Sequence, residues 1–142
     1  MGMFDNFTPT EISFNSPAYH YDDDTGDIII GATNTHLFNV PFILSEYADM
    51  FDVIYKQGLD VVLTKHYDFR ENNIEDIIVH ECDDKDFTII KVILNVDEGK
   101  RFKNSVLECQ AQMKIHMIDG TTYYSDAYDI SVKSPLDNSN AI

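Results

Sequence analysis

One stretch of strictly alternating residues near the C-terminus constrains the fold of this chain most strongly. From 107 to 117 every odd-numbered residue is apolar, and the even-numbered residues between them are polar. Successive side chains of a β-strand point to opposite faces, so this stretch predicts a strand with one buried face and one solvent-facing side. Asp119-Gly120 follows, and this dipeptide tolerates the positive φ angles of a two-residue type I′ turn. The pattern therefore predicts a β-hairpin over residues 105–133.

The second half of the hairpin tests this interpretation. A two-residue turn places Thr122, Tyr124, Asp126, Tyr128, Ile130 and Val132 opposite the six apolar residues of the first half. All of these except Asp126 suit a buried face, so we expect Tyr124 and Tyr128 to point into the core and Tyr123 to point outward. A slip of one residue would expose the whole apolar set. We predict a β-bulge near Ser125-Asp126 that removes Asp126 from the core.

The rest of the chain reads as short strands separated by turn residues. Further strands are predicted at 27–32, 35–43, 51–55, 61–69, 74–81 and 87–96, the last with Val96 facing the core. A three-residue loop, Gln57-Gly58-Leu59, would keep the strands on either side of it apolar on one face. Only residues 44–50 suggest a short helix, with Ser45 as its cap, and one further helical turn is expected within 97–102.

About eight short strands with almost no helix predict an all-β chain. The expected architecture is an antiparallel β-sandwich, Ig-like or jelly-roll-like, built as one domain. Residues 1–26 contain Pro9 and Pro17 and little apolar periodicity, so they are expected to form an extended N-terminal arm. The sandwich domain is assigned to 27–134 and a polar tail to 135–142.

Charge excludes several classes of partner. The 142 residues include 25 acidic and 10 basic ones, giving a formal net charge of -15. Nucleic acids and anionic membranes require positive charge on their partner, so neither is expected here. No apolar run approaches the length of a membrane span, and the acidic N-terminus lacks the features of a secretory signal.

Metal, redox and catalytic signals are weak. Asp22, Asp24 and Gly26 resemble the start of a calcium loop, but Thr33 occupies the position of its closing glutamate, so Asp22 and Asp24 are only weak candidates. The five histidines are never within four residues of one another and are interpreted as surface residues. Cys109 is expected in the core, and a disulfide with Cys82 stays open on geometry but is disfavoured by cysteine usage in non-secreted proteins. No catalytic motif or cofactor signature is present, so we expect neither an enzyme nor a cofactor.

Three segments resemble a family of small all-β structural proteins of tailed bacteriophages. These segments are FDVIYKQGLDVVLTK, DFTIIKVILNVDEGKRF and VLECQAQMKIHMIDGTTYYSDAYDISV, and together they are similar to the N-terminal module of upper baseplate proteins. The positions that carry the resemblance are Val53, Tyr55, Lys56, Gln57, Leu94, Asp97, Glu98, Phe102, Gln112, Asp119, Gly120, Ser125, Asp126 and Val132. The resemblance implies a virion component without catalytic residues. It also implies that Asp119, Gly120, Ser125 and Asp126 are structural anchors.

The leading hypothesis is a non-enzymatic virion protein of a baseplate, tail, neck or capsid surface. Its expected partners are other virion proteins and further copies of itself, and its extended ends suit such assembly. The alternative is a receptor- or carbohydrate-binding module, since tyrosines at 19, 21, 123, 124 and 128 could stack on sugars. A calcium-stabilised adhesion domain is a third hypothesis.

Overall fold

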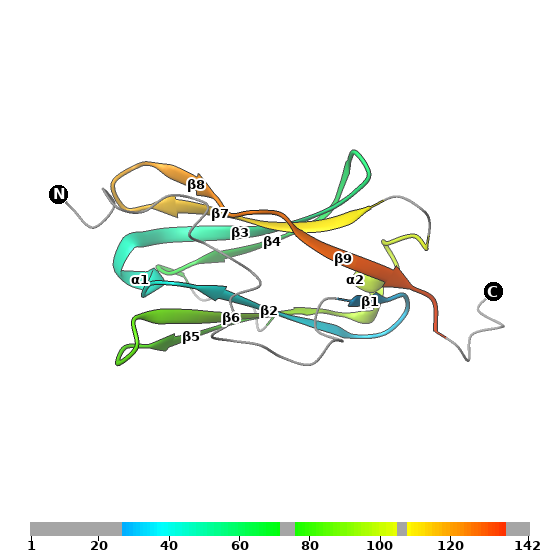
Figure 1. Ribbon diagram of the computed structural model, residues 1–142, viewed down its shortest axis with the longest axis horizontal. Helices are drawn as coiled ribbons and strands as arrows, with labels where there is room; N and C mark the ends of the chain where they lie inside the picture. The colour runs from blue at the N-terminus through cyan, green and yellow to red at the C-terminus, as the bar shows by residue number, and fades with distance from the viewer. Residues whose placement is uncertain (1–26, 72–75, 105–107, 136–142) are drawn as a thin grey trace.

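The computed structural model describes residues 27–71, 76–104 and 108–135, which form two β-sheets and two single-turn helices (Figure 1). The elements in chain order are β1 (Asp27–Ile29), β2 (Asn34–Val40), α1 (Leu44–Tyr47), β3 (Ala48–Gln57), β4 (Asp60–Asp68), β5 (Ile77–Cys82), β6 (Phe87–Leu94), α2 (Val96–Gly99), β7 (Cys109–Met117), β8 (Thr122–Tyr124) and β9 (Tyr128–Lys133). The prediction of an all-β chain is confirmed. Within the described ranges, no helix has both the length and the apolar character that crossing a membrane requires.

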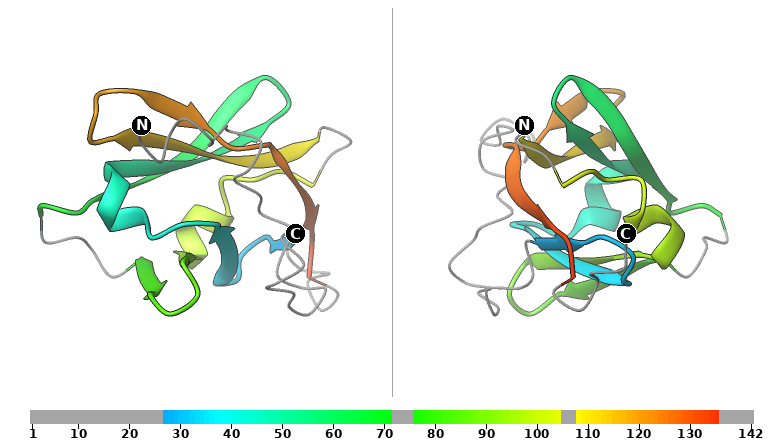
Figure 2. Two further views of the ribbon diagram at one scale, coloured as in Figure 1. Left: turned by 60° about the vertical axis from the view of Figure 1, so that its left-hand side comes forward. Right: turned by 90° about the vertical axis from the view of Figure 1, so that its right-hand side faces the viewer.

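The strands divide into a six-stranded and a three-stranded sheet. The six-stranded sheet has the order β1-β9-β7-β3-β4, with β8 also paired to β7, and the three-stranded sheet has the order β2-β6-β5. The six-stranded sheet curls, so that β9 crosses from one layer towards the other and ends beside β1 (Figures 1 and 2). The expected arm and the calcium candidates Asp22 and Asp24 lie outside the described residues.

The core lies between the two sheets. The six-stranded sheet supplies Phe51, Val53, Met113 and Ile115, and the three-stranded sheet supplies Phe38, Val40, Ile90, Val92 and Leu94. Each such side chain stabilises the fold by roughly 1.5–3 kcal/mol when it leaves water. As predicted, Phe38, Val40 and Phe42 are all buried, and β2 ends at Val40, just before Pro41, on an edge of its sheet.

One pair of strands departs from the antiparallel expectation. β1 pairs with β9 in parallel, with Ile28 opposite Val132. Lys133 Nζ lies 2.8 Å from Asp27 Oδ2, so an ion pair joins the same two strands. Strands far apart in sequence are free to pair in parallel, because no short turn fixes their direction.

The hairpin forms, but its turn differs from the prediction. Ile115 is opposite Tyr123, one residue away from the predicted register. The loop has three residues, Ile118 to Gly120, and Gly120 has φ 93°. Its ends are joined by the bond from Met117 N–H to Thr121 O, at 2.8 Å. A three-residue loop with glycine in the left-handed region is the next most common hairpin connection after the two-residue one.

This register reverses the predicted roles of two tyrosines. Tyr123 packs against the core, and Tyr124 is 44% exposed. Farther from the turn, Cys109 is opposite Ile130 and Ala111 is opposite Tyr128, which is the register predicted from a two-residue turn. The two registers differ by one residue, so the segment between β8 and β9 contains one extra residue relative to β7, as the predicted bulge near Ser125-Asp126 requires. Asp126 is exposed as a result.

Three smaller predictions were wrong. The β3–β4 loop has two residues, because Gln57 pairs with Asp60, and a register shift beside Lys56 then turns Leu63 inward and leaves Val61 58% exposed. The first residue of α1 is Leu44, preceded by Ile43 as N-cap, so Ser45 does not cap it. Val96 leaves the strand, begins α2 and is 39% exposed.

Candidate functional site

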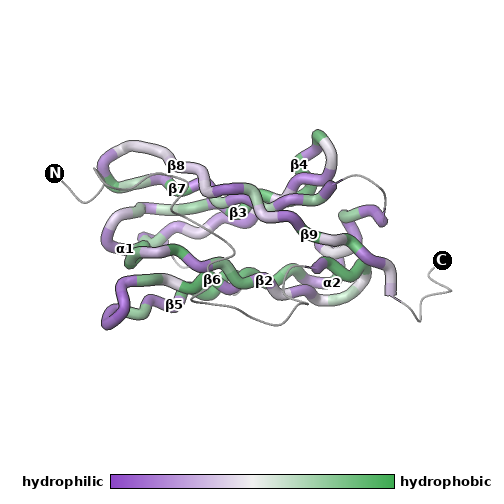
Figure 3. The backbone as a smooth tube through the Cα atoms, viewed as in Figure 1, coloured by the Kyte–Doolittle hydropathy of each residue, from purple (hydrophilic) through white to green (hydrophobic). Residues whose placement is uncertain are grey.

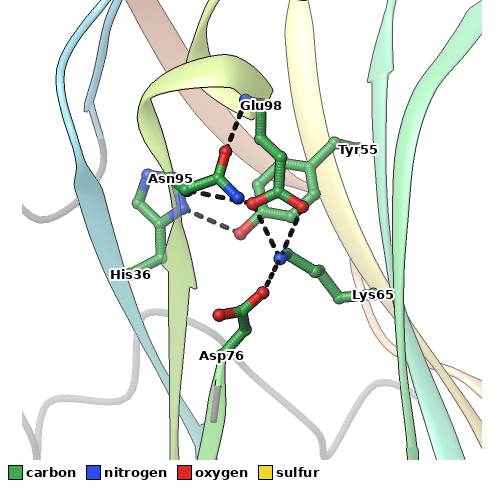
Figure 4. Close-up of polar contacts among 6 residues, drawn as sticks. All are labelled: His36, Tyr55, Lys65, Asp76, Asn95 and Glu98. Carbon is green, nitrogen blue, oxygen red and sulfur yellow. Dashed lines mark hydrogen bonds and ion pairs between the residues drawn. The ribbon is translucent and has the colours of Figure 1, made fainter. Parts of the chain in front are cut away.

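A buried lysine lies at the centre of a polar network between the sheets. Lys65 is on β4, points towards the interior and is only 4% exposed. Its Nζ lies 2.8 Å from Asp76 Oδ2 and 2.7 Å from Glu98 Oε2, with Glu98 Oε1 at 2.8 Å (Figure 4). A buried ammonium is tolerated only when it is paired, and here its three donors all face carboxylate oxygens.

Glu98 is fixed by the local structure of α2. Asn95 is the N-cap, and its Oδ1 accepts a hydrogen bond from the Glu98 N–H at 2.8 Å. Glu98 Oε1 accepts in return from the Asn95 N–H at 2.9 Å, which completes a capping box. The carboxylate therefore faces Lys65 with little freedom to reorient.

A second polar pair lies beside this network (Figure 4). His36 Nε2 is 3.0 Å from the carbonyl oxygen of Asp27, and His36 Nδ1 is 2.8 Å from the Tyr55 hydroxyl. A carbonyl only accepts, so Nε2 carries the proton and the Tyr55 hydroxyl donates to Nδ1. Burial lowers the pKa of His36 from its ordinary value of 6.5, which keeps the ring neutral. Burial also raises the pKa of Tyr55 well above 10, with smaller contributions from Cys109 and Glu98.

The network joins elements that the backbone does not pair. Lys65 and Tyr55 belong to the six-stranded sheet, and His36 belongs to the three-stranded sheet. Asp76 precedes β5 and its carbonyl accepts from the Ile93 N–H at 2.7 Å, so its carboxylate connects β4 to the opposite sheet. The charged and polar groups of the network satisfy one another's hydrogen-bonding capacity. Because they come from both sheets, these contacts hold one sheet in place against the other.

A second polar cluster lies on the outer face of the six-stranded sheet. Asp52 Oδ1 is 2.6 Å from His66 Nδ1, and Asp52 Oδ2 is 3.4 Å from His116 Nε2. His66 is half exposed, and His116 is less so. Nothing in the described part of the chain brings three or more histidine, cysteine, aspartate or glutamate side chains into a metal-binding arrangement.

The four predicted anchor residues divide between a turn and a bulge. Asp119 Oδ1 accepts from the N–H of Thr121 at 2.9 Å and from its hydroxyl at 2.6 Å, and these bonds lower the pKa of Asp119. Gly120 provides the positive φ angle of the same turn. The anchors Asp119 and Gly120 are thus adjacent in one loop.

The other two anchors stabilise the bulge. Ser125 is 3% exposed, and its Oγ accepts from the Met113 N–H at 3.0 Å. The Ser125 N–H donates to Met113 O at 2.9 Å, and its hydroxyl lies 3.0 Å from Asp126 O. The serine side chain thus replaces a backbone acceptor that the bulge removes.

Sequence reasoning missed the residues at the centre of the network. His36 was expected on the surface and is fully buried. Lys65 is two residues after Leu63 on β4, so both side chains point inward. This alternation could have identified Lys65 as a buried residue. Asn95 and Glu98 have capping-box spacing, which was also visible in the sequence. Both cysteines are free, with Cys109 in β7 and Cys82 at the end of β5 in the other sheet.

Comparison with known proteins gives no assignment. No protein-family model matches this chain, and no curated protein matches it.

Proposed function

We propose that this chain is a non-enzymatic structural component of a bacteriophage virion, acting through contacts with other virion proteins and with copies of itself. The proposed site in the particle is a baseplate, tail, neck or capsid surface. The proposal includes the finer fold, an Ig-like or jelly-roll-like β-sandwich of residues 27–134 with an extended arm formed by 1–26.

One observation carries this proposal. Two of the segments that resemble phage structural proteins lie side by side, and residues that carry the resemblance make contacts there. Tyr55 and Phe102 contact edge to face, with ring centroids 5.9 Å apart. Gln57 Oε1 accepts from the Lys103 N–H at 2.8 Å, and Gln57 is 5% exposed. These contacts support the proposal, because residues that a family retains for structural reasons are expected to hold one another in place.

The charge of the chain supports the choice of protein partners. A net charge of -15 opposes binding to nucleic acid and to anionic membranes. It also keeps single copies soluble and favours neighbours with basic surfaces.

The test is the mass of the purified protein in solution, measured by light scattering with and without residues 1–21. We expect a discrete closed oligomer that dissociates on truncation, while circular dichroism shows that the truncated domain still folds. An arm that belongs to the core would instead unfold the domain when removed. A monomer in both forms at all concentrations would contradict self-assembly through the arm.

A carbohydrate-binding module is the second candidate, favoured by the position of Tyr124. This ring is 44% exposed on β8, and Lys114 Nζ lies 5.8 Å from its centroid. The Tyr124 ring can stack on a sugar, and the Lys114 ammonium beside it can donate hydrogen bonds to the sugar's hydroxyls. Glycan-array binding by the protein that Tyr124→Ala abolishes would favour this candidate over the purely structural one.

A further inference from the structure

Strand β6 is apolar on both faces, although only one of them meets the core. Ile90, Val92 and Leu94 point between the sheets and are fully buried, while Ile89 and Ile93 point to the opposite face of the three-stranded sheet. Figure 3 colours much of β2 and β6 as hydrophobic. A strand of an antiparallel sheet with one face in water normally alternates, and a continuous apolar strand indicates that both faces are covered.

The apolar character of this outer face extends to both neighbouring strands. Leu37 of β2 and Ile78 of β5 are each in register with Lys91 of β6 and lie on the same side of the sheet as Ile89 and Ile93. Ile78 is 47% exposed. Neither residue, nor Ile89 or Ile93, belongs to the core or to the side chains packed against it. We call Leu37, Ile78, Ile89 and Ile93 the outer apolar face.

A buried polar atom on this face lacks a partner within the described part of the chain. Asn39 of β2 is opposite Ile89 of β6, so its side chain lies on the same side of the sheet as the outer apolar face. Asn39 is only 5% exposed. Its Oδ1 is buried and has no hydrogen-bond partner among the described residues. Buried side-chain acceptors are normally satisfied, so this oxygen is placed to accept a hydrogen bond from something that binds here.

The charges of this face identify the chemistry of the occupant. Lys91 and His80 are exposed, and Lys91 forms no ion pair with any described residue. The segment 1–21 contains no lysine or arginine and has acidic residues at positions 5 and 11. It also supplies apolar residues, among them Phe4, Phe7, Ile12 and Phe14. An acidic, apolar segment complements an apolar face that carries a cation.

The point at which this segment enters the domain also fits. Asp27, the first described residue, accepts a hydrogen bond through its carbonyl from His36 of β2, an edge strand of the three-stranded sheet. An extended chain spans about 3.3 Å per residue, so 21 residues reach roughly 70 Å. Three strands spaced about 4.8 Å apart are well within that length.

We infer that residues 1–21 dock on the outer apolar face of the three-stranded sheet. Apolar side chains of this segment cover Leu37, Ile89 and Ile93, and one of its carboxylates pairs with Lys91. A symmetric pairing of this face with the same face of a second copy is disfavoured, because it would bring two copies of Lys91 together without a counter-charge. The inference concerns where the arm binds and does not depend on the protein being a virion component.

The test uses the full chain with Phe14 replaced by photoreactive benzoylphenylalanine. After irradiation, mass spectrometry should find crosslinks to peptides that contain residues 35–39 and 78–93. Crosslinks to β4 or β7, or an absence of crosslinks within the protein, would overturn the inference.

Two lysine variants provide a matched pair for this measurement. Lys91→Glu places a negative charge on the outer apolar face and should reduce the crosslink yield at least five-fold. Lys114→Glu makes the same change on the outer face of the six-stranded sheet and should leave the yield unchanged. Equal losses in both variants would mean that net charge, not this face, governs the crosslink.

The size of the crosslinked product separates this inference from the proposed function. A product of two chains means that the arm docks on a neighbouring copy, which supports both. A product of one chain on the same peptides supports docking and contradicts assembly through the arm. As a second measurement, a fluorescent peptide of residues 1–21 should bind the truncated domain, and Ile12→Asp with Phe14→Asp in the peptide should weaken binding at least ten-fold.

Discussion

Lys65 Nζ lies between 2.7 and 2.8 Å from both carboxylate oxygens of Glu98, and this pair joins β4 to the helix that follows β6. The two residues are 33 positions apart in sequence and belong to elements that share no backbone ladder. Pairs of this kind restrict which arrangement of the two sheets is stable, because any other arrangement leaves a charge buried without a partner.

Replacing Lys65 with methionine should destabilise the fold by about 3 kcal/mol, because Glu98 and Asp76 then face each other without a cation. The measurement is the free energy of unfolding in urea. Lys56→Met, on exposed β3 surface, is the control and should change stability by less than about 0.5 kcal/mol. Similar losses in both variants would mean that the ion network does not stabilise the fold.

Stability should fall as the pH drops below about 6.5, through His36. Burial lowers the pKa of His36 in the folded protein, so the unfolded chain binds a proton in this range that the folded chain does not. The contribution is fully present above the unfolded pKa and decreases by at most about 1.4 kcal/mol per pH unit below it. Urea unfolding between pH 7 and pH 5 should show this slope in the wild type and in His80→Gln, and a weaker one in His36→Gln. An equal slope in all three would assign the pH dependence to other groups.

The sequence predicted what local patterns determine. Alternation in residues 109–117 identified a strand, and Asp126, the one residue unsuited to the buried face, identified the bulge. The turn was ambiguous, because Asp119-Gly120 suits both a two-residue and a three-residue loop. The neighbouring pair Tyr123 and Tyr124 could not decide the register, since either tyrosine is acceptable on the buried side.

What the sequence could not predict depends on contacts between distant segments. The parallel pairing of β1 with β9 joins residues more than a hundred positions apart, as between Asp27 and Ser131. Lys65 is recognisable as an inward-facing residue, but no local pattern connects it to its partner Asp76, which lies in the predicted strand 74–81 and just before the observed strand β5. His36 occupies the same face of β2 as Phe38 and Val40, but its hydrogen-bond partners, the Tyr55 hydroxyl and the Asp27 carbonyl, come from other strands and could not be predicted locally.

The two cysteines should differ strongly in reactivity. Burial raises the pKa of Cys109 to about 11, so at pH 8 only about one thiol in a thousand is ionised. We expect a thiol reagent to label the folded protein once, at Cys82, and twice after denaturation. Cys82→Ser should abolish labelling of the folded form, whereas Cys109→Ser should not change it. Rapid labelling of Cys109 in the folded protein would indicate that the core opens locally.

Gly120→Ala should destabilise the protein by about 1–2 kcal/mol, because alanine at φ 93° is strained. A Cβ at this position would meet no atom within 4 Å, so the cost comes from the backbone alone. Gly120→Asn is the matched variant, since asparagine tolerates the left-handed region better, and it should lose less. The check is thermal unfolding of the three proteins under identical conditions. If both variants match the wild type, the three-residue loop does not require glycine.

Ser125→Ala should destabilise the protein by about 1–3 kcal/mol, the cost of leaving a buried donor unsatisfied. Its hydroxyl is the acceptor for the Met113 N–H, which the bulge separates from the regular ladder. Ser131→Ala, on the exposed side of β9, is the control and should be nearly neutral. Amide hydrogen exchange adds a local measurement, because the Met113 amide should lose protection in Ser125→Ala while that of Ile115 keeps it. Protection retained at Met113 would mean that another group replaces the hydroxyl, and Ser125 would then not be the anchor of the bulge.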